Sequence, residues 1–190
     1  TTGVQHGREG SAETDRQYAL GATFAAGDLY LAGIVTQTNK QSVDYEGKSL
    51  GEQDDPLTVS LGGNYNFGVA KLYVATQYFK DTGLAVEMIQ TGNTAGTFDG
   101  FGLSVGADVP AFGGTAKVLV GYMDAEDQTT TANDVQRYTF SVGYEYPLSK
   151  RTFVYGGAGY YMDSYDKGFE AGYDDKASVA AVNAGLVHKF

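Results

Sequence analysis

The side chains that could carry out chemistry are few in this sequence, and their types limit what that chemistry can be. The sequence contains two histidines, His6 and His188, and no cysteine. A Ser-His-Asp site needs three groups that converge within hydrogen-bond reach. His6 lies in a polar N-terminal segment, and His188 shares a strand face with Leu186 and Phe190, so neither is placed to orient a serine or a water. The sequence therefore predicts no catalytic residue and no enzyme.

Acidic side chains are the most abundant charged groups, and they gather in three polar stretches. Their oxygens could bind Ca²⁺ or Mg²⁺, but the twelve-residue spacing of a calcium-binding loop is absent. A solvated acidic rim is the interpretation that we favour, and no metal ligand is predicted. The acidic residues concerned are Asp44, Glu46, Glu52, Asp54 and Asp55; Asp124, Glu126, Asp127 and Asp134; and Asp163, Asp166, Glu170, Asp174 and Asp175.

The charge balance and the glycine pattern argue against two further classes of ligand. With 13 Lys and Arg against 23 Asp and Glu, the formal net charge is -10, the wrong sign for the phosphate contacts that drive nucleic-acid binding. The run Gly156-Gly157-Ala158-Gly159 lies inside a strand pattern, whereas a dinucleotide-binding fingerprint follows a strand and opens a helix. We therefore expect neither nucleic acid nor a cofactor.

Strands are the elements that must position these side chains. The sequence holds 27 glycines, 15 tyrosines and 10 phenylalanines, a mixture that disfavours helices and suits a pleated, half-buried surface. Period-two alternation is plainest from Tyr138 to Tyr146, where even positions are apolar or aromatic and odd ones small or polar. The pattern predicts nine strands, at residues 17–25, 28–37, 57–67, 71–80, 101–109, 117–123, 138–146, 152–161 and 178–190. In the second and eighth of these, large apolar residues occupy both faces, so their orientation stays open.

The connections between the strands alternate between short and long along the whole chain. Tight turns are expected near residues 26–27, 68–69, 111–114 and 147–150, and long polar connections at 38–56, 81–97, 124–136 and 162–177. An antiparallel up-and-down β-barrel that spans a membrane sorts its turns and loops to opposite sides in this way. A soluble sandwich explains the alternation but neither this sorting nor the few charges on the polar faces. The fold prediction is therefore an all-β transmembrane barrel.

The alternation also predicts what each face of the strands meets. Apolar residues such as Val74, Val120 and Phe140 are expected to face lipid or a neighbouring subunit, and Gly, Ser, Thr and Asn to face a lumen. The charged residues on the lumen phase, which we expect to line a pore, are Lys71, Lys117, Arg137, Asp108 and Glu145. Asp108 and Glu145 lie near tight turns, so the part of the pore wall further from these turns is expected to carry a net positive charge.

A closed barrel of eight strands is the alternative if residues 17–25 do not form a strand. Such a small barrel is filled by side chains and conducts poorly. Gly62, Asn64, Gly102 and Ser141 on the polar faces are too small to fill an interior, and they favour a wider pore.

Two segments near the C-terminus resemble a known family. Residues 146–152 (Tyr-Pro-Leu-Ser-Lys-Arg-Thr), followed by Val154-Tyr155-Gly156, are similar to the penultimate turn of Gram-negative trimeric porins. Residues 185–190 (Gly-Leu-Val-His-Lys-Phe) resemble the Gly-Leu-x-His-x-Phe terminus of general diffusion porins of the β-proteobacterial type. Val187 departs from the family, in which this position is often basic. Together with the strand rhythm, the resemblance covers residues 17–190.

The resemblance implies a sixteen-stranded barrel. Residues 1–190 would form a single barrel domain that supplies its last nine strands, with residues 1–16 as the remnant of an extracellular loop and residues 17–190 as strands and loops. In the family a constriction loop folds inward from the front half, so ion selectivity stays open.

The resemblance also implies a function and partners. It implies a homotrimer in the outer membrane of a Gram-negative bacterium, with a water-filled channel for passive diffusion of small hydrophilic solutes and ions. Lipid and lipopolysaccharide would surround it, with divalent ions as a further bridge between the acidic rim and lipopolysaccharide phosphates. Phe190 would be recognised by the outer-membrane assembly machinery. A small structural barrel without a conducting pore, or a barrel enzyme whose site lies in a missing half, are the alternatives.

Overall fold

Strands make up most of the chain in this structure, a computed structural model. It describes residues 2–5, 16–39, 42–45, 48–52, 55–82, 97–128, 134–165 and 176–190. Within these ranges, no helix is long and apolar enough to cross a membrane. Backbone hydrogen bonds between neighbouring strands organise the described part of the chain.

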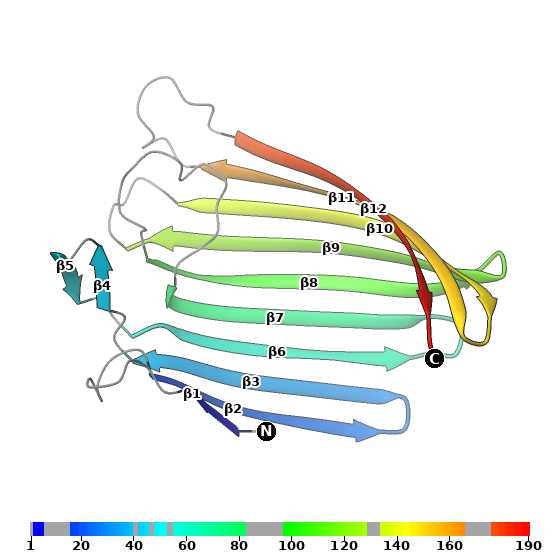
Figure 1. Cartoon of the computed structure of the whole chain (residues 1–190), viewed down its shortest axis with the longest axis horizontal. Coiled ribbons are helices and arrows are strands. Elements are labelled where there is room, and N and C mark those ends of the chain that lie inside the picture. Colours follow the sequence, from blue (N-terminus) through cyan, green and yellow to red (C-terminus); the bar gives the residue numbers. More distant parts are fainter. Residues whose placement is uncertain are drawn as a thin grey trace.

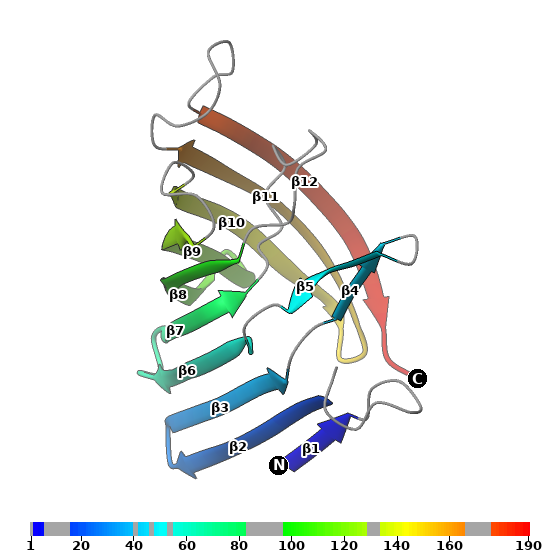
Figure 2. The same ribbon diagram turned by 90° about the vertical axis from the view of Figure 1, so that its left-hand side faces the viewer.

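Ten strands form one antiparallel sheet with up-and-down order (Figure 1). Between β3 and β6, the strands β4 (Ser42–Tyr45) and β5 (Lys48–Glu52) form a separate two-stranded ribbon. The sheet is curved, and β1 and β12 are its two edges (Figure 2). Its strands are β1 (Thr2–Gln5), β2 (Arg16–Ala26), β3 (Leu29–Asn39), β6 (Leu57–Asn66), β7 (Lys71–Thr82), β8 (Phe98–Ala111), β9 (Gly114–Asp127), β10 (Val135–Ser149), β11 (Thr152–Tyr165) and β12 (Lys176–His188). This order and curvature are those of part of a β-barrel.

All nine strands that the alternation predicts are present, and the sheet contains one more. Residues 2–5 form β1 and pair with residues 17–20 of β2. The prediction that residues 1–16 are a loop is therefore wrong for this part, while residues 6–15 lie outside the described residues. A strand of four residues is too short to show a period of two, which is why the sequence pattern missed it.

Most strands extend further toward the long connections than the alternation predicts. β9 continues to Asp127 and β11 to Tyr165, so acidic residues that we expected in loops lie in paired strands. Asp127 lies opposite Phe98, and Asp163 lies opposite Arg137. Because aspartate is depleted in strands, the sequence pattern does not predict a strand at these residues. In the structure, each aspartate is paired with a residue of the neighbouring strand.

The tight turns lie at one end of the sheet and the long connections at the other (Figure 1). We call these ends the turn end and the loop end. Gly27, Gly68 and Gly113 have φ angles of 56°, 80° and 80° in the tight turns, in a region that other residues rarely adopt. The predicted sorting of connections is confirmed, except that β10 runs past Pro147 to Ser149 before it turns.

Strand pairing shows which side chains share a face, because directly opposed residues point the same way. Val120 lies opposite Val105 on β8 and Phe140 on β10, and 50% of Val120 and 49% of Phe140 are exposed. Ser104 and Gly121 alternate with these residues and lie opposite each other. One face is therefore an exposed apolar surface, here called the outer face, and the other, called the inner face, is small and polar.

Pairing also resolves the two strands whose orientation the sequence left open. In β3, Val35 lies opposite an outer-face residue of β6, so Tyr30 lies on the inner face. In β11, Tyr160 lies opposite an outer-face residue of β10, so Phe153 and Tyr155 lie on the inner face. Aromatic rings therefore occur on the inner face near the turn end.

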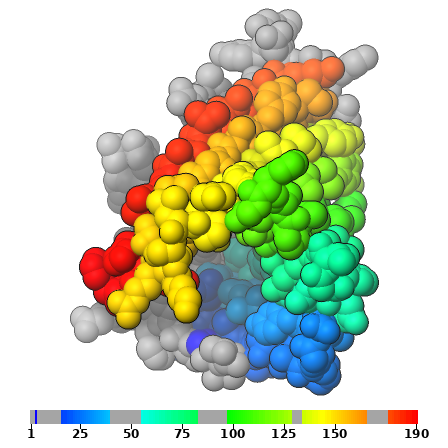
Figure 3. Space-filling view, turned by 90° about the vertical axis from the view of Figure 1, so that its right-hand side faces the viewer, coloured from blue at the N-terminus to red at the C-terminus, as the bar shows by residue number. Residues whose placement is uncertain are grey.

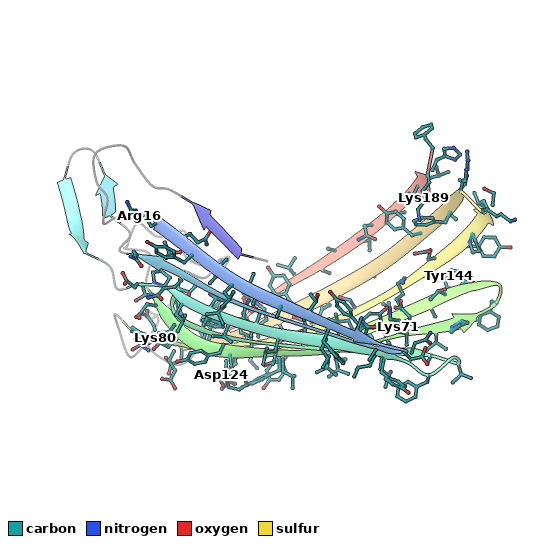
Figure 4. The ribbon with its side chains drawn as sticks, turned by 90° about the horizontal axis from the view of Figure 1, so that it is seen from below. Arg16, Lys71, Lys80, Asp124, Tyr144 and Lys189 are labelled. Atoms are coloured by element: carbon teal, nitrogen blue, oxygen red, sulfur yellow. The ribbon has the colours of Figure 1, made fainter. Side chains whose placement is uncertain are left out.

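Tyrosines near both ends of the outer face have hydroxyl groups held by hydrogen bonds. At the turn end, the Tyr144 hydroxyl lies 2.9 and 3.0 Å from the carbonyl oxygens of Ala111 and Phe112. Toward the loop end, the Tyr122 hydroxyl donates to a carboxylate oxygen of Asp124 at 2.6 Å, and Figure 4 shows Asp124 on the convex side of the sheet. An apolar ring with a polar tip suits the boundary between an apolar layer and water. The outer face thus has an apolar centre bordered by tyrosines.

Candidate functional site

The inner face is open along much of its length. Two hollows of about 570 and 690 Å³ lie on it. The smaller is lined by small or polar residues such as Ser60, Gln77 and Ser104, and the larger, toward the turn end, by charged and aromatic residues as well. Figure 3, which faces the turn end, shows the tight turns and the C-terminal end arranged around a hollow centre.

Charged side chains at the turn end meet around Asp108. Lys117 Nζ donates to Asp108 Oδ2 at 2.9 Å, and the Tyr73 hydroxyl donates to the same oxygen at 3.0 Å. Lys71 lies opposite Asp108, with its Nζ 5.2 Å from the centre of the Tyr73 ring. Glu145 lies on β10, and its charge acts on Lys117. In this turn-end cluster (Lys71, Tyr73, Asp108, Lys117 and Glu145) two lysines balance two carboxylates.

Near the loop end, Arg137 and Asp163 form an ion pair through two parallel hydrogen bonds. Arg137 Nε donates to Asp163 Oδ1 at 2.6 Å, and Nη2 donates to Oδ2 at 2.7 Å. The guanidinium also lies over the ring of Tyr161, with Cζ 4.5 Å from the ring centre. The Asp163 side chain is completely buried and that of Arg137 is 23% exposed. The two charges therefore offset each other within the wall.

A small apolar cluster on the inner face lies beside this ion pair. Its members, none more than 5% exposed, are Phe79, Phe98, Ala125, Val135 and Tyr165. The Tyr165 hydroxyl is 3.4 Å from Asp163 Oδ2, so the cluster and the ion pair are in contact. Apolar neighbours exclude water and lower the local dielectric, which strengthens the attraction between the paired charges.

A neutral belt separates the two charged regions. In the described strands β7 to β12, no charged side chain on the inner face lies between Lys117 and the Arg137 region. Met123, which lies opposite Arg137, is six residues beyond Lys117, a separation of roughly 20 Å along a strand. Small polar groups such as Thr139 and Ser141 lie in this belt, which therefore presents hydroxyls and backbone rather than charges.

All five predicted pore-lining residues lie on the inner face, and their role in lining a pore stays a prediction. The expectation of a net basic deeper wall is wrong for the described residues, because Asp163 offsets Arg137 and Asp127 lies on the same face. Both acids were expected in loops and so were not assigned to the inner face. Tyr161 and Tyr165, which flank Asp163 at a spacing of two residues, were the signal that could have extended this strand.

The C-terminal residues lie at the turn end of β12. His188 Nδ1 is 2.8 Å from Thr152 Oγ1, and the centres of the His188 and Phe190 rings are 5.0 Å apart. Phe190 is fully exposed. His188 is therefore held by a threonine hydroxyl and an aromatic ring at the edge of the sheet, and His6 lies outside the described residues.

The acidic residues were the candidates for metal binding. In the part of the chain that the structure describes, no group of three or more His, Asp or Glu side chains could hold a metal ion. Asp134 instead accepts a hydrogen bond from the backbone N–H of Asp127 at 3.2 Å. Several members of the three clusters, including Asp54, Asp174 and Asp175, lie outside the described residues.

Comparisons with known proteins agree with this geometry. The family model described as Gram-negative porin matches residues 1–166. An outer-membrane porin protein of Bordetella pertussis is 30% identical over an alignment of 194 positions, which covers 95% of this chain and 48% of that protein. An anion-selective porin from Comamonas acidovorans has the same fold, with a TM-score of 0.62 at 23% identity over 95% of this chain and 51% of that chain. The chain thus spans about half the length of the relatives it matches.

Replacing Asp163 with Asn tests the buried ion pair. The change keeps the side-chain volume but leaves the Arg137 charge uncompensated, and breaking a buried pair in this way costs about 3 to 5 kcal/mol. We expect Asp163→Asn to lower the free energy of unfolding by this amount, measured by urea titration of the refolded protein in detergent micelles. Asp108→Asn is the control, since partly exposed pairs contribute about 0 to 1 kcal/mol. Equal decreases in the free energy of unfolding of the two variants would contradict the assignment of Arg137 and Asp163 as a buried ion pair.

Proposed function

The chain belongs to the Gram-negative porin family, and on this basis we propose that it forms part of a water-filled channel in the outer membrane of a Gram-negative bacterium. Small hydrophilic solutes and ions diffuse passively along its inner face. The observation that carries the proposal is the division of one curved sheet into an exposed apolar face and a hollowed face of small and polar residues.

The outer face supports contact with lipid. Large apolar residues are exposed there, among them Leu20 on β2 at 66%, Leu61 on β6 at 57% and Phe140 on β10 at 49%. Apolar surface in contact with water costs roughly 25 cal/mol per Å², and contiguous exposed apolar patches of this kind mark interaction surfaces. Contact with lipid removes this cost. Lipid offers no hydrogen-bond partner to backbone N–H and C=O groups, so these groups must be paired within the protein. The ladders from β6 to β12 pair them.

The inner face supports an open pore over the two alternatives. A barrel without a pore needs an interior filled by side chains, whereas Gly121, Ser141 and Gly159 line the centre of this wall. An enzyme needs reactive groups that converge on a substrate. The charged groups here instead bind one another, as in the pair of Lys117 with Asp108, which favours a passive wall.

The sheet fits one part of a larger closed barrel. Its edges, β1 and β12, are not paired with each other in the described residues, and a transmembrane barrel leaves no edge unpaired. We assign the ten strands to the wall of a sixteen-stranded barrel, the size that the resemblance to general diffusion porins implies. The share of about half that the chain covers in its relatives supports this assignment.

The outer face of β11 and β12 is where we place the contact between subunits of a homotrimer. Gly156 and Ala158 lie there on β11, next to Ala180 and Ala184 on β12. Small residues allow two membrane proteins to approach closely, whereas the outer face of β8 to β10 carries larger aliphatic and aromatic residues. That larger surface is left for lipid, with lipopolysaccharide at the loop end.

Phe190 has the properties of an accessible signal for the outer-membrane assembly machinery. It is fully exposed, and its ring contacts that of His188 rather than a packed core. It lies two residues past the end of β12, an edge strand of the described sheet. An aromatic ring at a free edge can be bound by another protein without disturbing the rest of the sheet.

Planar-bilayer recording of the full-length protein tests the proposed function. Because the inner face is hollowed and lined by small and polar groups, we expect stepwise increases in conductance that scale with the bulk salt concentration. Heat-modifiable migration on gels provides the control that the protein has folded. A correctly folded preparation that never conducts would exclude the function.

The ion preference of the channel should respond to charge on the inner face more than to charge outside it. Lys117→Gln leaves Asp108 and Glu145 in excess, so the reversal potential in asymmetric KCl should shift toward cations. Asp124→Asn is the matched control, because this residue lies on the outer face, where salt screens its charge over about 8 Å. A shift for Asp124→Asn as large as that for Lys117→Gln would show that outer charges control selectivity.

Deleting Phe190 tests its role in assembly. The deletion should reduce the amount of protein in the outer membrane and leave unfolded protein in the periplasm, measured by fractionation and immunoblotting. Phe190→Tyr, which keeps the aromatic ring, should restore the yield. Both variants should refold from urea into detergent like the wild type, because Phe190 lies outside the ladder; unchanged yield after deletion would overturn the proposal.

A further inference from the structure

The inner face from β9 to β12 contains a place where the wall carries no side chains. Lys117, Gly143, Gly157 and Asn183 lie opposite one another in a row across these four strands. The two glycines in the middle form a bare floor, with Lys117 on one side and Asn183 on the other. This row lies within the hollow of about 690 Å³ near the turn end.

Tyr155 borders the same floor and lines the hollow. A Cβ atom at Gly185, the residue opposite Tyr155 on β12, would lie 2.6 to 2.7 Å from atoms of the tyrosine ring. The Tyr155 side chain therefore lies over Gly185, in space that a larger residue at position 185 would fill. The tyrosine stays 40% exposed and lines the hollow, so part of its ring is accessible from the hollow.

Polar groups of three kinds surround this ring and the glycine floor. Glu145 lies opposite Tyr155 and supplies a carboxylate, while Lys117 supplies an ammonium group that donates one hydrogen bond to Asp108. Asn183 supplies an amide, whose Oδ1 lies 3.2 Å from the position that a Cβ would take on Gly157. Hydrogen-bond donors and acceptors thus both lie around the floor, and Lys71, opposite Asp108, brings the charges to two ammonium groups and two carboxylates.

We propose that this hollow is a binding subsite for a pyranose sugar, and the proposal rests on the channel function above because the sugar reaches the subsite through the pore. A pyranose ring has a C–H face that packs on an aromatic ring and a rim of hydroxyls that both donate and accept hydrogen bonds. Small-molecule sites typically combine an apolar or aromatic surface with a few polar groups that fix the orientation of the ligand. A neutral ring suits the balanced charges, whereas an anion meets Glu145 and Asp108 and a cation meets Lys117.

Titration of D-glucose into single channels of the full-length protein tests the subsite. Glucose should reduce the current in a saturable way, and glycerol, a polyol without a ring, should reduce it only in proportion to viscosity. Tyr155→Ala should raise the half-blocking glucose concentration by about tenfold. Tyr155→Phe, which keeps the ring, should leave it within about twofold. Equal block by glucose and glycerol, or an unchanged block in Tyr155→Ala, would overturn the proposal.

Filling the floor provides a second variant that leaves the ring and the charges in place. A Cβ on Gly143 meets its nearest neighbour at 3.5 Å, an ordinary contact, so Gly143→Leu should fold and should weaken the glucose block by about tenfold. Gly102→Leu is the matched control, because Gly102 lies on the inner face outside this hollow and its nearest neighbour is at 3.8 Å. If the two substitutions weakened the glucose block equally, narrowing of the pore would explain the loss, and the proposed subsite would be overturned.

Binding can also be measured without current. Saturation-transfer difference NMR of glucose with the detergent-solubilised protein should give a signal in the wild type that Tyr155→Ala and Gly143→Leu lose. A protein that does not conduct but gives this signal would contradict the channel function and leave the subsite intact. A protein that conducts but gives no signal would overturn the subsite alone.

Discussion

The hydrogen-bond ladder between neighbouring strands is the constraint on which the rest of the wall depends. β8 and β9 pair without a break from Phe98 opposite Asp127 to Ala111 opposite Gly114. A slip of one residue would turn every side chain of a strand to the other face. Because an apolar layer offers no other partner for N–H and C=O groups, the ladder is retained, and it sorts apolar residues outward and small polar residues inward.

The inner face then determines what the wall can do. At the loop end, Arg137 is bound to a buried Asp163 beside an apolar cluster, and at the turn end Lys117 is bound to a partly exposed Asp108. Both arrangements remove net charge from the wall, and the belt between them is neutral. The described part of the inner face therefore presents paired charges near its two ends and neutral groups between them.

The sequence predicts the elements of this fold better than its site. Alternation from Tyr138 to Tyr146 gives the strand and its faces, because each residue there obeys the same local rule. The orientation of Tyr155 could not be predicted, since its ring fits the inner face only because Gly185 lies opposite on another strand. The pairing of Arg137 with Asp163, 26 residues away, likewise depends on the register of two strands rather than on spacing.

The central claim, that the inner face meets water and the outer face meets lipid, can be tested with single cysteines because the chain has none of its own. Ser104→Cys and Ser141→Cys place a thiol on the inner face, and Val105→Cys and Val142→Cys place one on the outer face beside them. The rate of reaction with a charged, water-soluble methanethiosulfonate reagent is measured in proteoliposomes. We expect fast reaction at 104 and 141 and slow reaction at 105 and 142. Equal rates, or the reverse order, would contradict the assignment of the two faces.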